Sequence, residues 1–174
     1  QWSKLRQLDF KIPEVKDAPP DSHADRFLKA LTQEIVPFVE ANYRIVSSDR
    51  CLYGYSSSGF FALYALFHQP DAFRRYLAGG ANLHIAYPYV IQHDEQLANR
   101  KATNPIQLYL SAGELELEQF PFFHQLVAFI EKGIYPGLTL ITEIYPGEKH
   151  GSEGAALTYL HGIRSVYLAD RPSP

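Results

Sequence analysis

The chain has 174 residues, which suits one domain spanning residues 1–174, and its composition is that of a globular protein. A net charge of −3 argues against a broad basic surface, so we expect no nucleic-acid partner. The longest strongly apolar run, residues 60–67, is too short to cross a bilayer, and the single cysteine rules out an internal disulfide framework. Because no signal peptide is visible, we expect a cytoplasmic location and no membrane partner.

The predicted elements alternate between helix and strand. The first is an amphipathic helix that Ser22 caps and Pro37 interrupts. Its apolar residues have helical spacing and are expected to pack on a core: Phe27, Leu28, Leu31, Ile35, Val36 and Val39. Short apolar runs predict strands at residues 51–55, 74–80, 106–113 and 138–146. Helices are predicted at residues 58–70, 120–133 and 151–168, with a loop and a helix from about Tyr89 within residues 82–101. This alternation predicts an α/β fold with a mostly parallel sheet and helices on both faces.

The segment GYSSSG, residues 54–59, combines three serines with two glycines between a predicted strand and a predicted helix. A nucleophile in such a turn needs small residues two positions before and two positions after it, because these two residues approach each other closely. Ser56 meets this requirement, with Gly54 before it and Ser58 after it. Ser57 follows Tyr55 by two positions, and Ser58 precedes Phe60 by two, so neither fits. The alternative interpretation of this segment is a serine-rich helix cap or a simple tight turn.

A serine nucleophile needs a histidine base, and the base needs an acid to orient it. In the α/β fold class that carries such a set, the chain order is serine, acid, histidine. Of the seven histidines, His150 alone lies in the glycine-flanked loop directly after the last predicted strand, whereas His161 lies within the helix that follows. The acid should follow the strand at residues 106–113, where Glu114, Glu116 and Glu118 occur. We favour Glu116, with Glu114 as the next candidate.

The segments GYSSSGFFALY, YLSAGELELE and YPGEKHGS resemble the esterase D-like putative esterase family of α/β-hydrolases. Within that family the chain is most similar to the branch of siderophore trilactone esterases, over roughly residues 20–165. The resemblance implies Ser56 as nucleophile, His150 as base and an acid in the loop of Glu114 and Glu116. It also implies that the backbone N–H of Ser57 is one donor of the oxyanion hole. The sequence departs from the family pattern at Ser58, where most members have glycine.

A complete domain of this family has further strands before the position that corresponds to Gln1, and this chain contains no methionine. We therefore expect the chain to hold only the C-terminal half of the fold. The preceding half normally supplies the second oxyanion donor. Its absence would expose the edge of the strand at residues 51–55, so we expect an N-terminal segment or a second copy in a homo-oligomer to cover that edge.

The function that these features imply is hydrolysis of a carboxylic ester, of siderophore type, through an acyl-enzyme intermediate. The substrate would be a small-molecule ester. No cofactor or metal is expected, because the histidines lack zinc-ligand spacing and GYSSSG lacks the lysine of a phosphate-binding loop. The alternatives are a carboxylesterase or thioesterase for short acyl groups, and a non-catalytic binding protein with the same fold.

Overall fold

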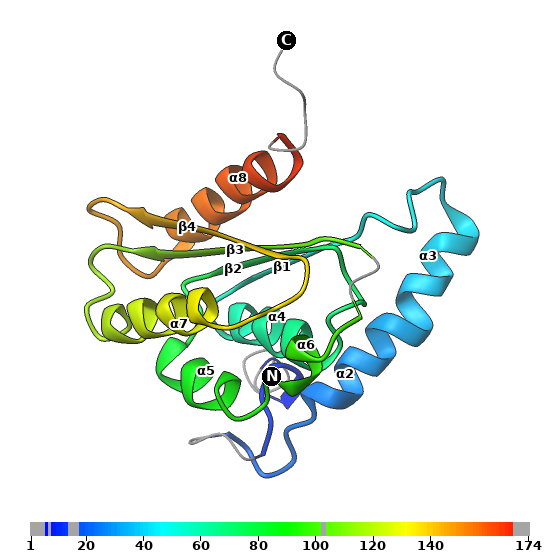
Figure 1. Ribbon diagram of the computed structural model, residues 1–174, viewed down its shortest axis with the longest axis horizontal. Helices are drawn as coiled ribbons and strands as arrows, with labels where there is room; N and C mark the ends of the chain where they lie inside the picture. Colours follow the sequence, from blue (N-terminus) through cyan, green and yellow to red (C-terminus); the bar gives the residue numbers. More distant parts are fainter. Residues whose placement is uncertain (1–5, 7, 14–17, 102–103, 169–174) are drawn as a thin grey trace.

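The computed structural model describes residues 6, 8–13, 18–101 and 104–168. Its centre is a four-stranded sheet in the order β1-β2-β3-β4, and every neighbouring pair of strands is parallel (Figure 1). The strands are β1 (Cys51–Tyr55), β2 (Arg75–Gly79), β3 (Ile106–Gly113) and β4 (Leu138–Tyr145). All four strands therefore end at the same edge of the sheet. The predicted parallel sheet and its four strands are confirmed.

Helices cover both faces of this sheet, as predicted. One face carries α4 (Ser57–His68), α5 (Leu83–Val90), α6 (Glu95–Ala98) and α7 (Phe120–Lys132). The other face carries α8 (Ser152–Leu168), which lies above the sheet in Figure 1. Every residue of β2 and β3 is buried, because helices pack on both sides of these central strands. β1 lies at one end of the strand order, and Tyr53 within it is 37% exposed.

The helix predicted from about Tyr89 begins earlier, and this prediction was wrong. α5 runs from Leu83 to Val90 and contains Pro88. Proline disfavours a helix interior, so the sequence around Pro88 does not by itself indicate a helix. The helix forms nevertheless, because it buries Leu83, Ala86, Tyr89 and Val90.

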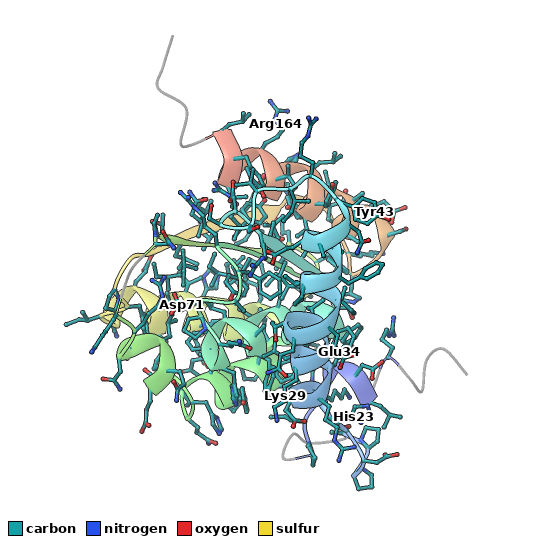
Figure 2. The ribbon with its side chains drawn as sticks, turned by 90° about the vertical axis from the view of Figure 1, so that its right-hand side faces the viewer. His23, Lys29, Glu34, Tyr43, Asp71 and Arg164 are labelled. Atoms are coloured by element: carbon teal, nitrogen blue, oxygen red, sulfur yellow. The ribbon has the colours of Figure 1, made fainter. Side chains whose placement is uncertain are left out.

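The first predicted helix is present as three consecutive segments: α2 (Ala24–Ala30), the π-helical turn η1 (Leu31–Ile35) and α3 (Val36–Asn42). Lys29, Glu34 and Tyr43 mark its course along one side of the molecule (Figure 2). The wider turn of η1 ends at Ile35, two residues before Pro37, which has no N–H for an i→i−4 hydrogen bond. Pro37 is thus accommodated by a change of helix type.

Two expectations for this helix were wrong. Ser22 does not cap it: the N-cap position is occupied by His23, and the buried Ser22 hydroxyl has no hydrogen-bond partner. The predicted apolar face packs on the core only at its start, where Leu28 is buried. Farther along, Ile35 is 47% exposed and the neighbouring Phe38 is 62% exposed. The helix leaves the covered face of the sheet after its first turns, so periodicity correctly predicted a helix but not the extent of its burial.

Candidate active site

Ser56 lies in a sharp turn between the end of β1 and the start of α4. Its backbone has φ 61° and ψ −124°, and within the described residues it is the only one other than glycine with a positive φ. This conformation is rare for a residue with a Cβ atom and is concentrated at functional sites. The N–H of Ser56 donates to the carbonyl of Gly79 at the end of the neighbouring strand, 3.0 Å away. The turn thus places Ser56 at the edge of the sheet where the strands end.

The small residues around Ser56 have the roles that the turn requires. A Cβ atom on Gly54 would lie 1.9 Å from the carbonyl oxygen of Ser58, so this position admits no side chain unless the backbone moves. The Ser58 hydroxyl donates to the carbonyl of Tyr55 at 2.8 Å and lies 3.0 Å from the Tyr55 N–H, which donates to it. Serine at this position is therefore accommodated and adds hydrogen bonds across the turn.

We predict that Gly54→Ala lowers the free energy of unfolding by roughly 3 kcal/mol or more, because the added methyl group can fit only if β1 or α4 shifts. Gly151→Ala is a matched control, since its Cβ atom would meet only the end of the flexible Glu153 side chain, at 3.3 Å. We expect the control to cost less than about 1 kcal/mol. Urea unfolding of both variants would measure the difference, and equal stability would contradict the close approach of Gly54 to Ser58.

His150 lies in the loop between β4 and α8 and makes two side-chain hydrogen bonds. Its Nε2 atom is 3.0 Å from the Ser56 hydroxyl, and its Nδ1 atom is 2.7 Å from Oε2 of Glu116. A carboxylate can only accept, so Nδ1 carries the proton and Nε2 is left to accept from the serine. The imidazole side chain is 44% exposed, whereas that of Glu116 is only 2% exposed. The histidine therefore bridges a buried acid and an accessible hydroxyl.

The loop after β3 determines which glutamate faces His150. Glu116 turns back toward the strand, and its Oε1 accepts the N–H of Gly113 at 2.9 Å. Glu114 points elsewhere: its carboxylate accepts the N–H of Gly147 at 2.7 Å, in the loop after β4. The backbones of the two loops are also joined, since the N–H of Leu115 donates to the carbonyl of Glu148 at 2.9 Å. The structure thus places Glu116, and not Glu114, against His150.

The other predicted site residue, Ser57, is the first residue of α4. The first N–H groups of a helix have no acceptor within the helix, so that of Ser57 is suited to bind an oxygen with developing negative charge.

Beside His150 lies a cavity of about 540 Å³. Its walls are formed by Gly80, Asn82, Leu115, Glu116, Leu117, Glu118, Gln119 and His150. Leu115 and Leu117 are 45% and 72% exposed, so they contribute accessible apolar surface to the wall of this cavity.

One residue of the site was missed by the sequence interpretation. Tyr55, directly before Ser56, packs its ring against His150 with 5.1 Å between the ring centroids. Tyr55 is the residue between Gly54 and Ser56 in the turn motif. The steric limits of the turn do not restrict which amino acid occupies that position, so the motif alone does not assign Tyr55 a role. Only the structure shows that its side chain reaches the histidine loop.

Comparison with known proteins gives the family. The model of the family described as "Putative esterase" matches residues 5–103, more than half of the chain. The chain belongs to this esterase family. The matched region contains Ser56 and ends before Glu116 and His150.

Two curated relatives of this esterase-family chain are siderophore esterases. Ferri-bacillibactin esterase BesA of Bacillus subtilis is 31% identical over 127 residues, which cover 66% of this chain and 44% of BesA. A siderophore enterobactin esterase of Emericella nidulans is 38% identical over 77 residues, which cover 41% of this chain and 25% of the relative. The chain therefore spans less than half the length of both relatives.

Solved structures show the fold. The BES protein of Bacillus cereus superposes with a TM-score of 0.80 at 23% identity, covering 93% of this chain and 63% of that protein. An IroE-like serine hydrolase of Shewanella oneidensis gives a TM-score of 0.76 at 24% identity, covering 97% and 58%. This esterase-family chain has the α/β-hydrolase fold and corresponds to about three fifths of these structures. Among its described helices, none is long and apolar enough to span a membrane.

Proposed function

We propose that this chain carries the nucleophile, base and acid of a serine esterase, namely Ser56, His150 and Glu116. The observation that carries the proposal is the continuous path of hydrogen bonds from Ser56 Oγ through both nitrogens of His150 to Glu116. Each of the three residues follows the carboxyl end of a different parallel strand, and α/β folds bind their ligands at this edge of the sheet. Membership of the esterase family supports the same reaction class.

The proposed reaction is ester hydrolysis in two steps. Ser56 Oγ attacks the ester carbonyl while His150 Nε2 takes the hydroxyl proton, and the N–H of Ser57 stabilises the resulting oxyanion. His150 then protonates the alcohol as it leaves, and the acyl group remains on Ser56. Water attacks this acyl-enzyme with His150 as base, which releases the acid and restores the serine. Glu116 keeps the Nδ1 proton in place and stabilises the imidazolium formed in each step.

For the substrate we propose an ester of siderophore type. The support is the activity for which two relatives are named, since BesA and the Emericella nidulans enzyme are both siderophore esterases. The cavity of about 540 Å³ beside His150, with its exposed leucines, offers room and apolar surface for one part of a bulky ester.

The test is reaction with a fluorophosphonate probe, followed by intact mass and tryptic mapping. We expect one adduct per chain, on the peptide that trypsin releases between Arg50 and Arg74, which contains Ser56. Labelling should stop hydrolysis of a p-nitrophenyl ester in proportion to occupancy. A folded chain that takes up no probe, or that stays active when fully labelled, would contradict the proposal. The first of these results would favour a non-catalytic binding protein.

A further inference from the structure

The side chain of Tyr55 contacts two parts of the loop that carries His150. Its ring packs against the His150 imidazole, with centroids 5.1 Å apart and planes inclined by 32°. Its hydroxyl accepts the backbone N–H of Gly151, the residue that follows His150, at 3.3 Å. One side chain therefore contacts both the imidazole and the backbone of the histidine loop.

Two glycines make room for this ring. A Cβ atom on Gly80, in the loop after β2, would lie 2.6 Å from Cζ of Tyr55. A Cβ atom on Gly154, in the first turn of α8, would lie 2.6 Å from the Tyr55 hydroxyl. The phenol is thus enclosed by backbone on two sides, and it has little freedom to move away from His150.

This placement bears on the proposed chemistry because His150 must hold two hydrogen bonds at once. A ring against one face of the imidazole restricts its rotation, and an aromatic face also attracts the imidazolium that forms during each step. Burial raises the pKa of the Tyr55 phenol above its usual value, and this effect is larger than the lowering of the pKa by the hydrogen bond from Gly151. The hydroxyl therefore stays neutral beside the Glu116 carboxylate.

We propose that Tyr55 is a positioning residue, which holds the His150 ring and the Gly151 backbone in register with the Ser56 hydroxyl. The proposal rests on the proposed esterase function. Tyr55 is bonded directly to Ser56, so the support for the base and the nucleophile itself belong to one turn of the chain. A movement of this turn would shift both partners together.

Tyr53 provides a matched control. It lies two residues earlier on β1, on the same face of the sheet, and its hydroxyl donates to the carbonyl of Ala155 in α8 at 2.8 Å. Its ring packs on Tyr159 with centroids 5.5 Å apart. Both tyrosines thus join β1 to the α8 region, but of the two rings only that of Tyr55 packs against His150.

The experiment compares Tyr55→Phe, Tyr55→Leu and Tyr53→Phe. For hydrolysis of a p-nitrophenyl ester, we expect Tyr55→Leu to lower kcat about 30-fold to 100-fold, with KM changed less than about threefold. Tyr55→Phe keeps the ring and should recover most of this loss, leaving kcat within about tenfold of the original chain. Tyr53→Phe should stay within about twofold.

A second measurement does not depend on catalysis. Loss of the hydroxyl removes the acceptor of the Gly151 N–H, so amide exchange at Gly151, measured by NMR, should become faster in Tyr55→Phe and not in Tyr53→Phe. Unchanged exchange at Gly151 in Tyr55→Phe, or a kcat of Tyr55→Leu within about twofold of the original chain, would overturn the positioning role. If the unaltered chain is inactive, the esterase proposal fails, and the exchange experiment alone decides whether Tyr55 holds the histidine loop.

Discussion

Replacing Ser56 by alanine is expected to lower kcat for ester hydrolysis by about 10⁵-fold to 10⁶-fold, or to the uncatalysed background. Without Oγ no acyl-enzyme can form, and His150 has no proton to take. The fold should survive, because alanine is smaller than serine and the turn is held by the backbone bond from residue 56 to Gly79 and by the Ser58 hydroxyl. The loss should therefore appear in kcat and not in stability.

The measurement pairs initial rates with thermal unfolding and fluorophosphonate labelling. Ser48→Ala is the control, since Ser48 is an exposed serine before β1, at the opposite end of that strand from Ser56. We expect Ser48→Ala to keep full activity and labelling, and Ser56→Ala to lose both while unfolding within a few degrees of the original chain. A probe adduct that persists on Ser56→Ala would assign the reactive group to another residue.

The second large effect is expected for Glu116→Gln, with a loss of about 10⁴-fold in kcat. The amide can keep its oxygen on the Gly113 N–H, which leaves its NH₂ group facing Nδ1 of His150. Two donors cannot share that contact, so the imidazole is driven toward the tautomer with the proton on Nε2. In that form it cannot accept the proton of Ser56.

Glu114→Gln separates this effect from a general loss of charge in the loop. Its amide oxygen can still accept the N–H of Gly147, so we expect kcat within about threefold of the original chain. The two variants have the same net charge and lie two residues apart, which makes the ratio of their kcat values the decisive quantity. A ratio near one would mean that Ser56 and His150 act without the acid.

Local sterics account for the part of the site that could be predicted from the sequence. The choice of Ser56 among three serines needs only its neighbours, because the crowding in the turn involves residues two positions away, and the 1.9 Å approach to Gly54 shows how severe this crowding is. The strands were predictable for a related reason, since short apolar runs between turn residues indicate buried strands. The order of these elements was enough to select His150 from the seven histidines.

Local sequence could not predict which of Glu114 and Glu116 faces His150. Both glutamates belong to one short turn, and nothing in their immediate neighbours distinguishes them. Their directions depend on the loop after β4, more than 30 residues away in the sequence, whose Gly147 binds one carboxylate while His150 binds the other. The contact of Tyr55 with that same loop, the exposure of Phe38 and the start of α5 before Pro88 are likewise consequences of packing.

The parallel α/β framework, the sharp turn at Ser56 and the order of Ser56, Glu116 and His150 along the chain were therefore predictable from the amino-acid sequence. Three features required the folded structure: which carboxylate turns toward His150, which aromatic ring packs on that histidine, and which part of the first helix is covered. This division reflects the distance along the chain over which each interaction acts. Steric limits and hydrophobic periodicity act between near neighbours in the chain, whereas the orientation of a loop side chain depends on hydrogen bonds and contacts with distant segments.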